Sequence, residues 1–147
     1  MDNSSRATML IRRPPAAVFN AFVQPSMLRK FWLSYASGPL APGATVTWEF
    51  MVPGAKDRVT VTHFEQPRQL SLRWSDGSEV SMTFEPYGHE ATRAVVKVSG
   101  FTGDRALSAA TTTIEGYAIV LCDLKTLLES GRSANLVRDK AELIAKH

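Results

Sequence analysis

The sequence predicts an α+β fold in which a curved antiparallel sheet of about six strands wraps around a long helix near the C-terminus. Residues 105–131 carry apolar side chains at helical spacing and end at Gly131, which predicts one long helix. Between residues 45 and 101, five runs alternate apolar and polar side chains, and the short turn-like links between them predict an antiparallel meander. Helix and sheet each have a wide apolar face, so we expect each to cover the other.

The chain begins with a strand and two short helices. Residues 7–13 (ATMLIRR) are typical of a strand. The Pro-Pro pair that follows ends this strand and opens a first helix, because proline is tolerated in a first helical turn. A second short helix follows Pro25, with Ser26 as its expected N-cap. Residues 33–44 carry Ser, Gly and Pro and are predicted to form a loop.

Each strand of the meander is expected to direct every second side chain inward. The link at Asp76-Gly77 is the clearest hairpin signal. A change of pattern near His63 predicts a β-bulge. The residues predicted to face inward are Val46, Trp48, Phe50, Val59, Val61, His63, Leu70, Leu72, Trp74, Val80, Met82, Phe84, Ala94, Val96 and Val98.

The long helix has an apolar stripe and a polar side, on which Glu115 and Asp123 are expected to lie. Gly116 is unfavourable inside a helix, so it indicates either a close backbone approach or space left for another group. Ile119 points away from the stripe and indicates a second contact. The stripe consists of Ile114, Tyr117, Leu121, Leu124 and Leu128, widened by Ala118, Val120 and Leu127.

The last segment, residues 132–147, is predicted to form another helix with an apolar side that includes Leu136, Val137, Leu143 and Ile144. This side either packs on its own domain or, together with Ile119, forms the surface of a homodimer. The length of 147 residues predicts a single domain, 1–147, with a core at 7–131 and a helical tail at 132–147.

The composition is that of an ordinary globular protein, with 44% hydrophobic and 21% charged residues. The net charge is +3, but the 17 Lys and Arg residues are scattered, so we expect no nucleic-acid partner. No apolar stretch approaches about 18 residues and no apolar signal core is seen, so neither membrane insertion nor secretion is expected. The single cysteine, Cys122, fits a structural thiol in the reducing cytoplasm.

Several short motifs resemble the START-like SRPBCC superfamily, and within it the branch related to the activator of heat-shock-protein-90 ATPase. The motifs are PPAAVFNAF, PSMLRKFW, PGATVTWEF, PRQLSLRW and EGYAIVLCDLKTLLE, in this order over about residues 7–131. The sequence departs from the family pattern at Phe19, Phe31 and Tyr117, where tryptophan is usual. The resemblance implies a helix-grip fold with a cavity between sheet and helix, often used for apolar ligands. It does not imply one activity.

We find no catalytic constellation, metal-ligand set or cofactor motif in the sequence. The three histidines, His63, His89 and His147, lack metal-ligand spacing, and no glycine-rich phosphate loop is present. His89 and His147 are expected to be solvated, whereas His63 either lines the cavity or lies at its rim. These absences favour a role other than catalysis.

The aromatic and apolar inward-facing residues are either plain core or the wall of a cavity, with a few polar groups among them. On the second interpretation the chain binds a small apolar or aromatic molecule without covalent chemistry. The alternatives are an enzyme of cyclase or hydrolase type that uses the same cavity, and a co-chaperone-like interaction module. The predicted cavity residues are Trp32, Tyr35, Trp48, Phe50, His63, Leu72, Trp74, Met82, Phe84, Ile114, Tyr117 and Leu121.

Overall fold

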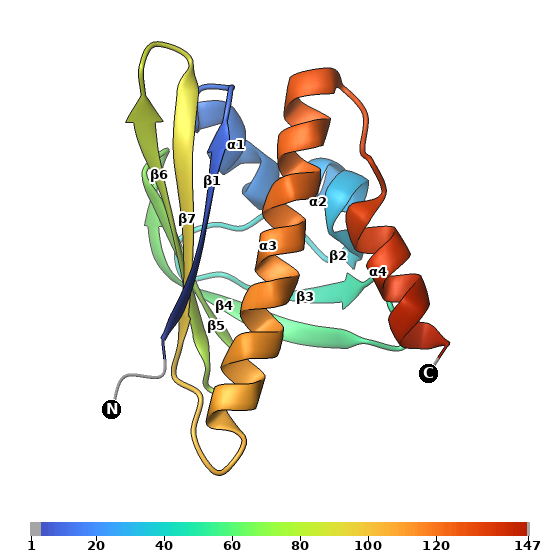
Figure 1. The fold of residues 1–147 in the computed structure, drawn as a ribbon. Coiled ribbons are helices and arrows are strands. Elements are labelled where there is room, and N and C mark those ends of the chain that lie inside the picture. The colour runs from blue at the N-terminus through green and yellow to red at the C-terminus, as the bar shows by residue number, and fades with distance from the viewer. Residues whose placement is uncertain (1–3, 147) are drawn as a thin grey trace.

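A computed structural model describes residues 4–146 and shows one curved sheet with four helices (Figure 1). The strands are β1 (Ser5–Ile11), β2 (Leu33–Ala36), β3 (Thr45–Phe50), β4 (Lys56–Glu65), β5 (Gln69–Trp74), β6 (Glu79–Tyr87) and β7 (Ala91–Ser99). The helices are α1 (Pro15–Val23), α2 (Pro25–Phe31), α3 (Ala106–Ser130) and α4 (Leu136–Ala145). The sheet curves around α3, which confirms the predicted helix-grip fold.

The sheet is antiparallel throughout, in the order β1-β7-β6-β5-β4-β3-β2. It has seven strands where about six were predicted, because part of the expected loop at 33–44 forms β2. The short strand β2 pairs with β3, and the side chain of Ser34 bonds to the carbonyls of Glu49 and Phe50. A stretch of four residues is too short to show an alternating pattern that would reveal a strand.

The predicted β-bulge is confirmed and changes which side chain faces inward. The register of β4 against β5 shifts between Val61 and His63, so that His63 pairs with Ser71 and Phe64 pairs with Leu70. Beyond the shift Phe64 turns inward, where its ring meets that of Phe19 with centroids 5.2 Å apart. His63 is therefore displaced to the outer face of the sheet.

The long helix α3 begins and ends close to the predicted bounds. Gly131 follows it with a φ of 82° and donates its N–H to the carbonyl of Leu127 at 2.8 Å, as expected of a glycine C-cap. Tyr117, Leu121 and Leu124 are buried against the sheet, as predicted, but Ala118 is exposed. The second helix, α2, has Gln24 and not Ser26 at its N-cap, with Pro25 as the first helical residue.

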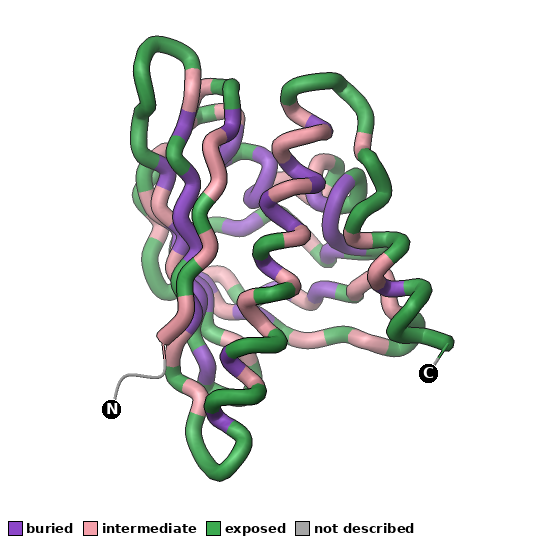
Figure 2. Tube along the Cα trace, in the orientation of Figure 1, coloured by how far each residue is buried: buried purple, intermediate pink, exposed green. Residues whose placement is uncertain are grey.

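The C-terminal tail packs on its own domain as helix α4, beside α3 (Figure 1). Ala141 is buried and Val137 packs against the core, whereas Leu136, Leu143 and Ile144 stay exposed. Buried segments lie on the inner side of the sheet and the facing side of α3, and the outward side of α4 is exposed (Figure 2). None of the helices formed by residues 4–146 is both long and apolar enough to cross a membrane.

The carboxylate of Asp123 fastens this tail to α3. It was predicted on the polar side of α3 but is 1% exposed, because the α3–α4 connection covers it. One oxygen accepts a hydrogen bond from the Ser133 hydroxyl at 2.7 Å, and the other accepts one from the N–H of Val137 at 3.2 Å. Asp123 therefore occupies the N-terminus of α4, where a negative charge and a hydrogen-bond acceptor are both favourable.

Candidate functional site

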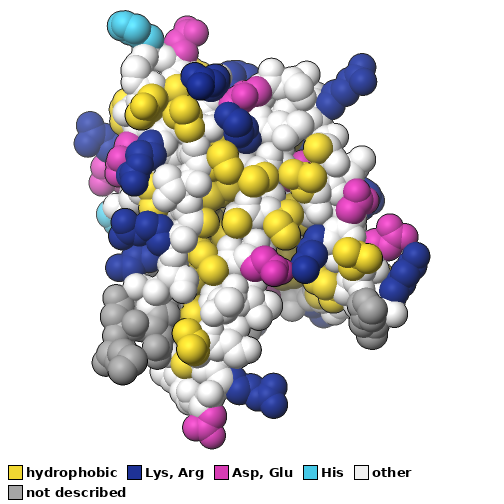
Figure 3. All heavy atoms as spheres, viewed as in Figure 1, with side chains coloured by type: hydrophobic (Ala, Val, Ile, Leu, Met, Phe, Trp, Pro, Cys, Tyr) yellow, Lys and Arg dark blue, Asp and Glu magenta, His cyan; other side chains and the backbone are white. Residues whose placement is uncertain are grey.

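A cavity of about 360 Å³ lies where the middle of α3, the inner side of α4 and the end of the sheet meet. The sheet contributes residues from the ends of β3, β4 and β5 and from the two turns beside them. From α3 come Gly116, Tyr117 and Val120, and from α4 come Val137, Ala141 and Ile144. Its wall is mainly apolar. Figure 3 shows apolar side chains gathered along the outward surface of α3 and on α4, on the face that contains this junction.

Five aromatic rings form a continuous chain beside the cavity, which we call the aromatic belt: Tyr117, Trp32, Trp48, Trp74 and Phe50. Successive ring centroids lie 5.4, 4.9, 5.7 and 5.9 Å apart. The first three contacts are edge-to-face, with interplanar angles of 67–70°. All of its members except Trp48 line the cavity. Edge-to-face contacts are favourable in themselves and fix the orientation of each ring.

Two buried polar atoms of the belt have no hydrogen-bond partner among the described residues: the hydroxyl of Tyr117 and the indole N–H of Trp48. Burial raises the pKa of the Tyr117 phenol, and the nearby Trp74 side chain has a smaller, opposite effect. The phenol therefore stays protonated and neutral at physiological pH. A buried polar group without a partner costs about 1–3 kcal/mol. Of the two residues only Tyr117 lines the cavity, so a polar atom of a bound molecule would be favourable beside its hydroxyl.

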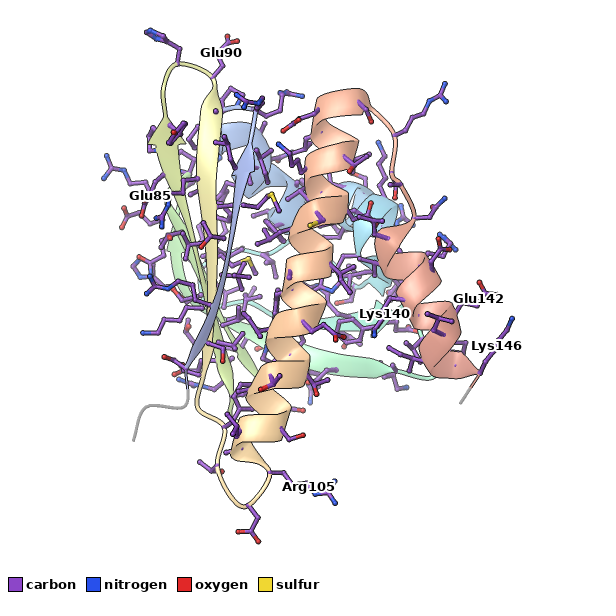
Figure 4. The ribbon with its side chains drawn as sticks, viewed as in Figure 1. Glu85, Glu90, Arg105, Lys140, Glu142 and Lys146 are labelled. Carbon is purple, nitrogen blue, oxygen red and sulfur yellow. The ribbon has the colours of Figure 1, made fainter. Side chains whose placement is uncertain are left out.

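Charged side chains stand at the edge of the apolar wall. Asp57 is half-buried and accepts a hydrogen bond from the N–H of Arg58 at 2.7 Å. Asp76 accepts bonds from the N–H and hydroxyl of Ser78 in the β5–β6 turn. Lys140 points from α4 toward α3 (Figure 4) and forms an ion pair with Glu115 at 3.0 Å. The lysine is thus the only one of the three with an ion-pair partner in residues 4–146.

Of the residues predicted to line a cavity, the structure brings Trp32, Phe50, Trp74 and Tyr117 together in its wall. Trp48 is fully buried behind them. The remaining apolar ones belong to the core between the sheet and α3: Leu72, Met82, Phe84 and Leu121 are fully buried, and Ile114 packs against this core. The cavity therefore occupies only one end of the region in which it was expected.

Tyr35 and His63 lie outside the cavity, contrary to the expected position of both. Tyr35 is 46% exposed on the edge strand β2. The side chain of His63 is 47% exposed on the outer face of the sheet, with its Nε2 3.5 Å from a carboxylate oxygen of Glu65. The β-bulge accounts for His63, and the unpredicted strand accounts for Tyr35. His89 is exposed in the β6–β7 turn, and His147 lies outside the described residues.

The sequence analysis missed the contribution of α4 and of the β3–β4 turn, which supplies Met51 and Val52. The apolar side of the tail was visible in the sequence, but not the place where it packs. Gly116 and Ile119 could have indicated where the cavity lies, because both interrupt the helical pattern of the sequence and both line the cavity. A Cβ atom added at Gly116 would meet nothing within 4 Å, so this glycine leaves space and does not permit a close backbone contact.

Within residues 4–146, no group of three or more His, Cys, Asp or Glu side chains is arranged to hold a metal ion. Cys122 is partly buried on α3 and is not among the cavity residues. The cavity offers apolar surface, aromatic rings, the Tyr117 hydroxyl, one lysine and two carboxylates.

Comparison with known proteins places this fold in a family. Residues 12–129 match the family model described as activator of Hsp90 ATPase homolog 1-like protein. The chain belongs to this family. It lies within the START-like SRPBCC proteins that the sequence motifs indicated. No protein with a curated description matches the chain.

Solved structures share the fold of this family member. A protein from Staphylococcus saprophyticus is 25% identical, with a TM-score of 0.74 over 90% of this chain and 95% of that chain. The Aha1 dimer from Colwellia psychrerythraea is 22% identical, with a TM-score of 0.74 over 88% and 98% of the two chains. A protein from Mesorhizobium loti is 20% identical, with a TM-score of 0.74 over 86% and 96%.

Proposed function

We propose that this family member binds a small apolar or aromatic molecule in the cavity between the sheet, α3 and α4, without covalent chemistry. The observation that carries the proposal is a mainly apolar cavity of about 360 Å³ with four rings of the aromatic belt in its wall. Ligand sites are typically apolar hollows of about 300–1,000 Å³ with a few placed polar groups. Affinity would come from apolar burial, at about 25 cal/mol per Å² before ordering costs.

The first experiment asks whether a ligand accompanies the protein. Protein purified from its own host would be measured by native mass spectrometry and then extracted with organic solvent. We expect a bound apolar compound that is released on unfolding. A protein mass without any adduct, together with no thermal shift across a library of lipids and aromatic compounds, would contradict the proposal.

A pair of leucine substitutions on one helix tests whether the molecule occupies this cavity. Gly116→Leu places a side chain into the cavity, whereas Ala118→Leu adds the same side chain on the exposed side of α3. We expect the first variant to lose the ligand and the second to keep it, with both still folded by circular dichroism. Equal retention by both variants would place the ligand elsewhere.

The enzymatic alternative has less support from the geometry. Asp57, Asp76, Lys140 and Tyr117 are the cavity residues with titratable side chains, and none of them is hydrogen-bonded to another. General acid–base catalysis needs a donor and an acceptor positioned together at the reacting atoms. The co-chaperone alternative predicts that the chain raises the ATPase rate of a chaperone, whereas the binding proposal predicts no effect on that rate.

The exposed side of α4 supports a second copy of the chain as a partner. Leu136 and Leu143, one heptad apart on this helix, are 37% and 60% exposed, and the cavity-lining Ile144 is 51% exposed beside them. The similar Aha1 structure from Colwellia psychrerythraea is a dimer. Leu143→Lys should then shift the sedimentation coefficient from dimer to monomer, while Leu107→Lys, at an exposed leucine on α3, should not. Identical sedimentation of wild type and both variants as a monomer would contradict this partner.

The cellular site that fits this proposal is the cytoplasm. Cys122 is the only cysteine and is free, so no disulfide within the chain is available to stabilise it in an oxidising compartment.

A further inference from the structure

Of the charged side chains in the cavity wall, the lysine forms an ion pair with a described residue and the two aspartates do not. Lys140, its one cationic side chain, is already paired with Glu115 at 3.0 Å. The two carboxylates, Asp57 and Asp76, have hydrogen bonds only to backbone N–H groups and to the Ser78 hydroxyl. Within the described chain neither aspartate of the wall forms an ion pair, although the protein as a whole has a net charge of +3.

Asp57 stands on the face of the sheet that is otherwise apolar. In the β3–β4 ladder it is the direct partner of Trp48, and the next inward residue of β4 is the fully buried Val59. Directly paired residues of antiparallel strands have Cβ atoms about 4.5–5.5 Å apart on the same face. The carboxylate is thus held next to the aromatic belt, in surroundings where a charge interacts more strongly than it does in water.

The belt supplies the second half of a cation site. The face of an aromatic ring is negative, and a cation within about 6 Å of the ring centre is attracted to it. Four rings of the belt line the cavity, and the contact between Trp32 and Tyr117, at an interplanar angle of 69°, turns these two lining rings in different directions. Plain apolar ligands need no such faces and no carboxylate beside them.

We propose that the ligand of this cavity is an organic cation, a molecule with an apolar or aromatic body and an ammonium group that lies between the aromatic belt and the carboxylate of Asp57. The buried hydroxyl of Tyr117 is available to a polar atom of the same molecule. This inference rests on the proposed function, because it specifies the chemistry of the molecule that the cavity holds.

An anionic ligand is the rival to this inference. It would have to share its one cationic partner in the cavity wall, Lys140, with Glu115, and it would lie close to two carboxylates. Like charges at short range are unfavourable in a partly desolvated site. A cation meets neither cost.

Two probes of equal shape separate charge from apolar burial. Benzyltrimethylammonium carries the cation, and neopentylbenzene has a carbon atom in place of its nitrogen. Binding is followed through tryptophan fluorescence, because Trp32 and Trp74 line the cavity. We expect the cation to bind at least about tenfold more tightly than the neutral probe, with an advantage that decreases as sodium chloride is added.

A carboxylate-to-amide substitution tests the role assigned to Asp57. Asp57→Asn keeps the shape of the side chain and should weaken binding of the cation about fivefold, with no change for the neutral probe. Glu90→Gln, at the end of the sheet away from Lys140 (Figure 4), is the matched control and should change neither. Asp57→Ser, which also removes the charge, provides a second test if Asp57→Asn does not fold.

The outcomes separate this inference from the proposed function. Binding of neopentylbenzene that is as tight as that of the cation, and that is lost in Gly116→Leu, would leave the cavity as the binding site and overturn the inference. The inference is also overturned if the preference for the cation survives the removal of the Asp57 carboxylate. Failure of both probes to bind the wild-type protein would contradict the inference and the proposed cavity together.

Discussion

Tyr117 is the residue at which stability and binding are most clearly opposed. Its hydroxyl is buried and has no hydrogen-bond partner in the described chain. We predict that Tyr117→Phe raises the free energy of unfolding by about 1 kcal/mol, because the cost of the unpaired hydroxyl disappears. The same variant should bind a polar aromatic ligand more weakly than the wild type does.

Urea denaturation and ligand titration of the two proteins measure both effects. A loss of stability of more than about 1 kcal/mol would show that the hydroxyl has a stabilising partner, such as a buried water.

Gly116 offers a second prediction at the scale of one residue. Alanine is favoured over glycine inside a helix by about 0.5–1 kcal/mol, and a Cβ atom here meets nothing within 4 Å. Gly116→Ala should therefore raise the melting temperature while it narrows the cavity. Gly131→Ala is the contrasting variant. With a φ of 82° this position is strained for alanine, so the free energy of unfolding should fall by about 1 kcal/mol. Destabilisation by Gly116→Ala would mean that the helix approaches another group at this point.

At the scale of an element, α4 depends on Asp123 for its attachment. Asp123→Ala removes the acceptors of the Ser133 hydroxyl and the Val137 N–H, and should cost about 2–3 kcal/mol. Because α4 buries little apolar surface beyond Val137 and Ala141, it should open before the rest of the molecule.

Hydrogen exchange by mass spectrometry should show rapid exchange of residues 136–145 in Asp123→Ala, with α3 still protected. Glu142→Gln is the control, because it changes only an exposed ion pair with Lys146 within α4. Uniformly faster exchange over the whole chain would contradict a local attachment. Since α4 forms one wall of the cavity, ligand affinity should fall with its detachment.

At the scale of the whole molecule, Glu129 ties the first strand to the end of α3. Its carboxylate accepts hydrogen bonds from the Lys125 ammonium at 2.7 Å and from the N–H of Arg12 at 2.8 Å. Lys125 also donates to the carbonyl of Leu10 at 2.8 Å. The hydrogen bond from Lys125, and next that from Arg12, lower the pKa of Glu129 below its ordinary value of 4.5.

A lowered pKa in the folded state gives a definite pH dependence. The carboxylate contributes its full stabilisation above pH 4.5, and the contribution is lost as the pH falls below this value toward the folded-state pKa. Glu129→Gln should therefore be less stable than the wild type at pH 7, and the difference should shrink in acid. Urea titrations from pH 7 to pH 3 measure this. A difference that stays constant with pH would exclude ionisation as its cause.

Alternation of side chains was sufficient to predict the meander, since one face of each strand must be apolar to meet the core. The inward positions of Trp48, Leu72 and Met82 follow from this period alone, and all three are fully buried. The helical spacing of Tyr117, Leu121 and Leu124 determined α3 in the same way, and Gly131 determined its end. These features are local consequences of periodicity and of backbone conformation.

Tertiary packing decided where space remains. The sequence cannot distinguish an aromatic residue in a packed core from one in a cavity wall, because both are apolar and face inward; Phe84 became core, and Trp74 became wall. The β-bulge near His63 was predicted from the sequence. That it directs His63 outward and Phe64 inward depends on how β4 pairs with β5. The inward position of Asp57 follows from the same alternation as that of Val59 and Val61 once β4 is known to begin at Lys56, whereas the placement of α4 over the cavity arises from contacts between residues distant in sequence. Periodicity therefore determined the fold, and long-range packing determined the site.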